Sequence, residues 1–169
     1  MPVRICLLSD THGHLDDRIL ELVRDADEIW HAGDFGDIAV SDRLKSLKTL
    51  RGVYGNIDGQ PLRSLHPEYL SFNVEDVKVL MIHIAGPFGS YAPGTRKLID
   101  ELRPNVLVCG HSHILKVQFD QRHKLLFVNP GAAGKHGFHK VRTLLRFTVS
   151  GDRLTDLEAV ELGLRGAIG

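Results

Sequence analysis

The chain has 169 residues, 43% of them hydrophobic, which suits one domain with a substantial core and is too short for two ordinary domains. Its 21 basic and 21 acidic side chains cancel, so the overall charge gives no reason for strong binding to nucleic acid or to an acidic membrane. The sequence contains neither a stretch of about 20 apolar residues nor the apolar segment of a signal peptide, so we expect a cytoplasmic protein without a membrane span.

The first two thirds of the chain alternate between predicted strands and helices. Five apolar runs of strand length begin at residues 3, 27, 50, 77 and 105, and they end at Asp10, Asp34, Asn56, His83 and His111. Apolar residues recur at helical spacing over 15–23, 38–47 and 98–102, and Pro104 helps to stop the last of these helices. This alternation predicts a mostly parallel sheet with right-handed crossovers.

The last third of the chain changes character. Short strand candidates over 114–120, 124–130, 143–151 and 153–162 are joined by the turn-like segments QRH and SGDR, which favours antiparallel hairpins. We therefore expect an α/β (α+β) fold in which two sheets pack face to face with helices outside. A single domain over residues 1–163 and a frayed tail over 164–169 are predicted. Cys6 and Cys109 lie inside apolar runs and are predicted to be small core residues.

The polar residues at the strand ends predict one shared site, because ligands of open α/β sheets bind beyond the carboxyl ends of the strands. Two carboxylates, one amide oxygen and four imidazoles are candidates for metal ligands: Asp10, His12, Asp34, Asn56, His83, His111 and His113. Such mixed ligands suit Mn, Ni, Fe, Co or Zn better than Ca or Mg. Seven ligands are too many for one open site, so we expect two divalent ions, with Mn first, about 3.5 to 4 Å apart and bridged by Asp34.

Two pairs of these residues are separated by one position, Asp10 with His12 and His111 with His113. Side chains two apart on an extended segment point to the same side. We therefore expect each pair to reach neighbouring ions from an extended backbone.

The ordered motifs SDTHGH, HAGD, GNID, MIH, CGHSH and NPGAA resemble those of the calcineurin-like metallophosphoesterase superfamily, and specifically its small single-domain bacterial and archaeal phosphodiesterases. The resemblance covers about residues 3–150 and implies a four-layer sandwich of two mixed β-sheets flanked by helices, the metallophosphoesterase fold. It also implies a dinuclear metal hydrolase. Carried over by position, Asp10, His12 and His113 belong to the first metal, Asn56, His83 and His111 to the second, and Asp34 bridges.

The sequence departs from the family pattern at two positions near this site. GNID places Ile57 where the family commonly has a histidine that assists the leaving group. NPGA places Ala132 where the family has a serine. We expect poor leaving groups to be cleaved less readily as a result, since Ile57 cannot donate a proton.

The resemblance implies a phosphodiesterase in which a metal-bridging hydroxide attacks phosphorus in line. The residues expected to serve catalysis are Asp34, Asn56 and Asp58, with Asp58 acting from behind the ligands by holding the Asn56 loop. Candidate substrate contacts are His14, Lys135 and His136. The expected partner is a small phosphodiester, and the sequence leaves homo-oligomerisation open.

Plainer interpretations remain for several residues. Asp10 and Asp34 each precede a helical segment and could be helix N-caps instead of ligands. His31 is interpreted as a core residue or as support for a ligand, whereas four histidines are predicted at the surface: His66, His123, His136 and His139. The whole chain could also be a non-catalytic interaction module, as in the retromer scaffold subunit of the same family, although a scaffold has no need for all seven ligands.

Overall fold

The computed structural model describes residues 1–166, which form strands and helices in an order that begins as a β/α alternation and ends in hairpins. The elements are β1 (Val3–Leu8), α1 (Asp17–Arg24), β2 (Glu28–His31), α2 (Ile38–Leu47), β3 (Thr49–Gly52), α3 (Leu62–Leu65), β4 (Tyr69–Val74), β5 (Val77–Ile82), α4 (Pro93–Leu102), β6 (Val106–Val108), β7 (Leu115–Asp120), β8 (Leu125–Pro130), β9 (Val141–Ser150) and β10 (Arg153–Leu164).

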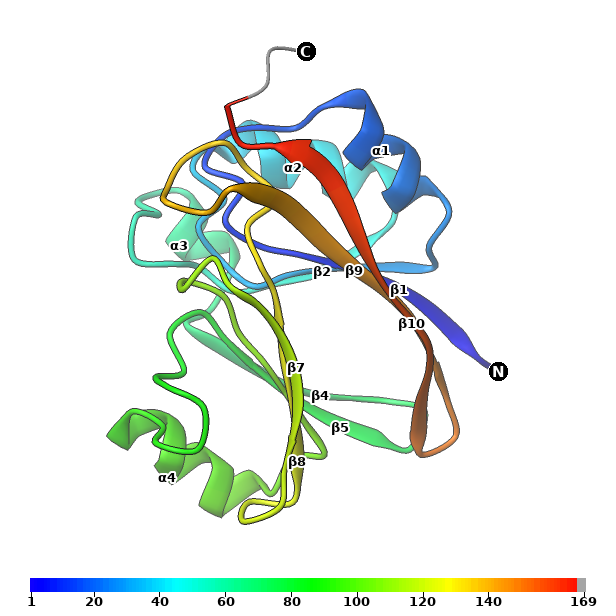
Figure 1. Cartoon of the computed structure of the whole chain (residues 1–169), viewed down its shortest axis with the longest axis vertical. Coiled ribbons are helices and arrows are strands. Elements are labelled where there is room, and N and C mark those ends of the chain that lie inside the picture. Colours follow the sequence, from blue (N-terminus) through cyan, green and yellow to red (C-terminus); the bar gives the residue numbers. More distant parts are fainter. Residues whose placement is uncertain (167–169) are drawn as a thin grey trace.

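The strands form two mixed sheets, as predicted (Figure 1). The first has the order β10-β9-β1-β2-β3 and the second β4-β5-β6-β8-β7. Strands β1, β2 and β3 run parallel, as do β5, β6 and β8, while the remaining pairings are antiparallel. The two predicted hairpins exist, but β7 and β8 complete the second sheet whereas β9 and β10 complete the first.

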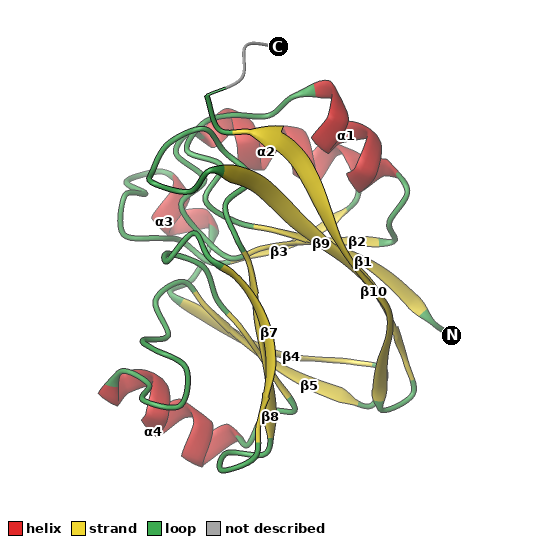
Figure 2. Ribbon diagram, viewed as in Figure 1, coloured by secondary structure: helices red, strands yellow, loops and turns green. Residues whose placement is uncertain are grey.

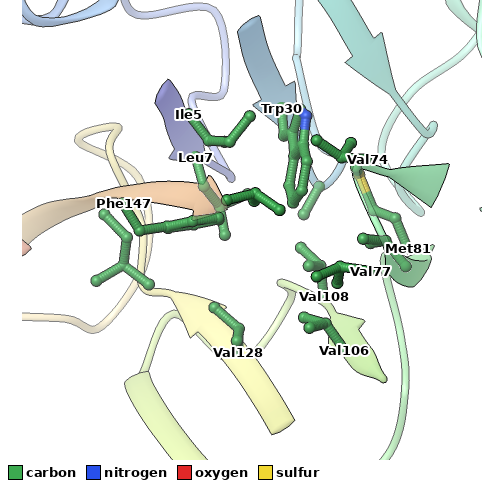
Figure 3. Packing of buried hydrophobic residues seen from close by; sticks show 14 of the residues in the cluster. Ile5, Leu7, Trp30, Val74, Val77, Met81, Val106, Val108, Val128 and Phe147 are labelled. Atoms are coloured by element: carbon green, nitrogen blue, oxygen red, sulfur yellow. The ribbon is translucent and has the colours of Figure 1, made fainter. Parts of the chain in front are cut away.

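The main core lies between the sheets (Figure 3). Ile5 and Leu7 of β1 face Val79 and Met81 of β5 across this layer, joined by Trp30. The alternate residues of the same strands, Cys6, Leu8 and Leu80, pack on the outer faces. Strands buried on both faces read as continuous apolar runs, which explains the sequence pattern.

Helices cover the outer faces and complete four layers (Figure 2). Helices α1 and α2 pack on the first sheet through residues such as Ile19 and Leu44. Helix α4 packs on the second sheet through Ile99. The predicted four-layer sandwich is therefore confirmed.

The observed helix N-caps show whether Asp10 and Asp34 are caps, which the sequence left open. Asp16 caps α1 by accepting from the Ile19 amide, and Asp37 caps α2 by accepting from the Ala39 amide. Asp10 and Asp34 are therefore not helix caps, and their side chains remain available for another role.

The C-terminal boundary differs from the prediction. Leu164 still pairs with Val141 in β10, and the Arg165 amide donates to the Lys140 carbonyl. The rest of the predicted tail, 167–169, lies outside the described residues. The described part of the chain contains no helix that is both long enough and apolar enough to cross a membrane.

Both cysteines are buried, as predicted, at the two outer faces of the sheets. Burial raises the pKa of the Cys6 and Cys109 thiols to about 12. Neither thiol is therefore a nucleophile at neutral pH.

A buried carboxylate joins the β7–β8 turn to the segment before α4. Asp120 accepts from the Tyr91 hydroxyl at 2.6 Å, from His123 Nδ1 at 2.8 Å, and from the amides of Arg122 and His123. Burial alone would raise the pKa of Asp120, but these hydrogen bonds outweigh it and lower the pKa to about 2. His123 is thus a structural residue and not the surface residue predicted.

Asp120→Asn is expected to lower the free energy of unfolding at pH 7 by about 1 to 3 kcal/mol, the usual cost of weakening hydrogen bonds to a buried charged group. The folded-state pKa lies below the unfolded one, so the carboxylate stabilises above about pH 4 and this contribution is lost between about pH 4 and 2. Urea unfolding at pH 7, 4 and 3 should show the two proteins converging. The exposed substitution Asp152→Asn is the control, and a gap that stays constant over this range contradicts the assignment.

Candidate metal centre

The site lies where the two sheets turn their carboxyl ends to the same edge. The loops after β1, β2 and β3 of the first sheet carry Asp10, His12, Asp34 and Asn56, and the loops after β5 and β6 of the second carry His83, His111 and His113. The structure therefore brings all seven predicted ligands together. The loop after β8 closes the site from a further side.

Most of these side chains are held by unusual backbone conformations. The φ angles are positive at five of the seven positions: Asp10, His12, Asp34, His111 and His113. The two pairs separated by one residue therefore lie on tight turns, and the expectation of an extended backbone is wrong. Left-handed conformations are unfavourable for residues with a Cβ and concentrate at functional sites.

Each carboxylate uses one oxygen to hold the protein and turns the other inward. Asp10 Oδ2 accepts from the Ser9 hydroxyl at 2.7 Å and from the His111 amide at 3.1 Å. Asp34 Oδ1 accepts from the Ile57 amide at 3.0 Å. Asp10 Oδ1 and Asp34 Oδ2 face the histidines.

His83 lies at the middle of the site and is oriented by a backbone carbonyl. Its Nδ1 donates to the Ala32 carbonyl at 2.7 Å, so Nε2 faces Asp34 Oδ2 at 3.2 Å and Asn56 Oδ1 at 3.0 Å. This position requires Gly33, since a Cβ there would lie 2.5 Å from the ring. Burial opposes charge on both partners, but their mutual hydrogen bond prevails, lowering the pKa of Asp34 and raising the pKa of His83.

The ligand atoms fall into two groups within 4.8 Å: Asp10 with His12 and His113, and Asp34 with His83 and His111. These are the groups that the resemblance implied. Asn56 Oδ1 belongs with the second, 3.0 Å from His111 Nδ1. Asp34 Oδ2 lies 3.5 Å from His12 Nε2 and 3.2 Å from His83 Nε2, between the two groups.

The residues fit a divalent metal. Asp10 Oδ1 and His12 Nε2 are buried, 4.0 Å apart, and neither has a hydrogen-bond partner among residues 1–166. Burial lowers the pKa of His12, so its ring is neutral and offers a lone pair. Buried polar atoms without partners are costly, and an ion coordinated by both would satisfy them.

Asp58 joins two loops of the site. Its carboxylate accepts from the amides of Phe35 and Gly36, directly after Asp34, and from the amide of Gly55, directly before Asn56. Asp58 is therefore a positioning residue that holds the Asn56 loop, which is where the sequence analysis placed it.

Two further histidines support the Asp34 loop from inside the core. His31 accepts from the Gly33 amide through Nδ1 and contacts Thr11 Oγ1 through Nε2, and burial keeps its pKa far below the usual value. Its ring stacks on Phe35, which stacks on His66. The surface prediction for His66 is wrong, because the residue is buried and bonded to Ser41.

The predicted substrate contacts lie in different places. His136 is exposed, lines a cavity of about 480 Å³ that opens over the ligands, and stacks on His12 at 4.7 Å. His14 instead forms a hydrogen bond with Asp16 at the start of α1. In the described part of the chain, the cavity lining includes neither His14 nor Lys135.

The sequence analysis missed His139, which it placed at the surface. His139 Nε2 lies 2.9 Å from the Gly134 carbonyl and must donate to it, since a carbonyl only accepts. Burial lowers the pKa of His139, so its ring is neutral and Nδ1 accepts from His113 Nδ1 at 3.2 Å. With Nδ1 of His113 donating to His139, Nε2 is the nitrogen left to face a metal, and it lies 3.2 Å from Asp10 Oδ1.

His139→Ala should weaken metal binding to the Asp10, His12 and His113 group by about tenfold, the lower range for loss of a residue that orients a ligand. The group containing Asp34 should be unaffected. Stepwise Mn²⁺ titration followed by electron paramagnetic resonance separates the two, with the exposed variant Lys140→Ala as control. Equal weakening of both groups would show a general structural effect instead.

The fold and the residues at its edge define a metallophosphoesterase. A family model for the calcineurin-like phosphoesterase superfamily domain matches residues 3–152. The chain belongs to this superfamily. It is 33% identical over 137 residues to a protein of Methanocaldococcus jannaschii named as a probable metallophosphoesterase, a match that covers 76% of this chain and 67% of that protein.

Solved structures share the fold. Vps29 of Chaetomium thermophilum superposes with a TM-score of 0.73 at 17% identity, covering 96% of this chain and 97% of that one. An archaeal phosphodiesterase superposes with a TM-score of 0.71 at 21% identity, covering 94% of this chain and 99% of that one. The superfamily and the candidate metal groups together indicate a hydrolase of phosphoesters.

Proposed function

We propose that the protein is a dinuclear metal-dependent phosphodiesterase that acts on a small diester in the cytoplasm. The observation that carries the proposal is the pair of ligand groups that meet at Asp34 Oδ2, with two buried ligand atoms that have no hydrogen-bond partner among the described residues. Asp10, His12 and His113 would hold one ion, Asn56, His83 and His111 the other, and Asp34 both. When bound, two divalent ions supply Lewis acidity and an activated water.

The protein's own residues set the geometry of the site and determine which groups can donate a proton. Asp58 holds the Asn56 loop against the Asp34 loop through three backbone amides. Ile57 lines the cavity where a proton donor could stand, and it has no proton to give. Because position 57 supplies no proton to the leaving oxygen, activated leaving groups are favoured.

A non-catalytic scaffold is the second candidate. It is supported by the likeness to Vps29 and by the absence of the leaving-group histidine at Ile57. The complete ligand set favours the enzyme, since a scaffold gains nothing from buried ligand atoms that have no hydrogen-bond partner among the described residues.

Metal reconstitution with turnover tests the two candidates. After loading with Mn²⁺, elemental analysis should give two ions per chain, and bis(4-nitrophenyl) phosphate should be hydrolysed. Chelation should abolish turnover and fresh Mn²⁺ should restore it. One tightly held ion in excess metal contradicts the dinuclear arrangement. Two ions without turnover under Mn, Ni, Co or Zn, and a protein partner whose binding survives His83→Ala, would favour the scaffold.

A further inference from the structure

The cavity above the ligands combines imidazole rings with an apolar rim. Among the described residues, its lining consists of His12, Asp34, Asn56, Ile57, His111, Ser112, His113, Ile114, His136, Gly137, Phe138 and His139. This part of the chain contributes no lysine or arginine to the lining. The wall therefore offers an occupant little positive charge beyond that of bound metal.

The rim consists of Ile57, Ile114 and Phe138, which come from three separate loops. Ile57 is 48% exposed, Ile114 is 65% exposed, and Phe138 is fully exposed at 102%. Exposed apolar residues scattered singly over a surface need no explanation, but three that converge on one cavity indicate a binding surface.

Each rim residue is next in sequence to a residue that faces inward. Ile57 follows Asn56 and Ile114 follows His113, while Phe138 precedes His139, the partner of His113. The loops that hold the inward side chains in place therefore also set the distance of the rim from the centre. A molecule bound by its phosphate at the centre would have its substituents against the rim.

We propose that the substrate is a phosphodiester of single negative charge that carries an apolar or aromatic substituent, which binds against Ile114 and Phe138. The proposal rests on the proposed function, because the metal centre must hold the phosphate. The exposed ring of His136, stacked on His12, adds a flat surface beside the rim.

The distribution of charge supports this class over polyanions. Phosphate monoesters, polyphosphates and nucleic-acid strands carry further negative charge, which proteins usually match with Lys or Arg. Arg63 lines a different cavity of about 240 Å³, which Asn56 also lines. There it bonds to the carbonyls of Asn56 and Asp58 and stacks on Tyr54.

A pair of diesters with the same leaving group tests the proposal: phenyl 4-nitrophenyl phosphate and methyl 4-nitrophenyl phosphate. The phenyl ester is intrinsically more reactive, so the readout is the phenyl-to-methyl ratio of kcat/KM in a variant relative to the unaltered protein. The double substitution Ile114→Ser with Phe138→Ser should lower this ratio by about tenfold, as expected for lost burial of a phenyl ring. Phe119→Ser, 56% exposed on β7 and outside the cavity lining, is the matched control and should leave the ratio unchanged.

Binding without turnover separates this proposal from the proposed function. Calorimetry on the Mn²⁺-loaded protein should show tighter binding of diphenyl phosphate than of dimethyl phosphate, and the rim variant should lose the difference. Rim-dependent binding with no hydrolysis of any diester would overturn the enzyme but not the ligand class. Three results would overturn the proposal: equal binding of the two diesters, an unchanged ratio in the rim variant, or tighter binding of phenyl phosphate than of diphenyl phosphate. The rim would then be a surface for a macromolecular partner.

Discussion

Asp34→Asn is expected to weaken both metal positions together and to reduce diester hydrolysis by on the order of 10³-fold, equivalent to about 4 kcal/mol of transition-state stabilisation. The inward oxygen, Oδ2, lies between His12 and His83. An amide can keep the hydrogen bond with the Ile57 amide, but it lacks the negative charge that two cations would share. Elemental analysis for Mn and kcat/KM on bis(4-nitrophenyl) phosphate measure the two effects.

Asp37→Asn provides the matched control for this substitution. Asp37 is exposed and caps α2, and asparagine caps helices about as well as aspartate, so metal content and turnover should not change. If Asp34→Asn leaves both metal affinities and turnover intact, Asp34 does not bridge the two positions.

Ile57→His is expected to raise hydrolysis by roughly tenfold for activated leaving groups and by up to about 100-fold for alkyl ones, part of the 10²- to 10⁴-fold typical of general acid–base catalysis. The side chain of Ile57 is half exposed in the cavity wall, so an imidazole fits without displacing the core. The neighbouring Asn56 loop is already held by Asp58 through the Gly55 amide.

A series of diesters with leaving groups of increasing pKa measures this effect. The unaltered protein should show a steep fall in rate as the leaving group becomes less acidic, and Ile57→His should make the fall shallower. Leu65→His, at an exposed apolar position of α3 outside the cavity lining, serves as control. No gain at any leaving group would mean that another group already protonates the leaving oxygen or that the centre is not catalytic.

Much of the fold could be predicted because the central strands are buried on both faces. Their apolar runs correspond to β1, β2, β5 and β6, the run that begins at residue 50 corresponds to the edge strand β3, and the three longer helices lie where the apolar spacing placed them. Strand β4 was missed although Leu70, Phe72 and Val74 alternate with polar residues, the pattern of a strand with one covered face. The two hairpins were predicted, but not the sheet that each one joins, because pairing between strands far apart in sequence leaves no local sequence pattern.

The ligand set could be predicted because each parallel strand ends in a chemically distinctive residue. The turns that carry Asp10 and His111 could not, since their positive φ angles are imposed by contacts between loops. The roles of three histidines also depend on contacts with residues that are distant in sequence. His66 and His123 are structural, and His139 orients His113 through a contact between residues 26 apart in sequence.

The left-handed backbone at five ligand positions sets stability against function. Each such residue costs about 1 to 2 kcal/mol that glycine would not, so glycine in place of a ligand whose side chain makes no hydrogen bond would relieve this strain. Natural proteins with this fold would then keep the strained ligand residues only under selection for the function of the metal centre. A laboratory selection for heat resistance alone would accept glycine first at His12, whose Nε2 has no hydrogen-bond partner among the described residues, and would keep Asp10 and Asp34, whose outer oxygens accept hydrogen bonds from the protein.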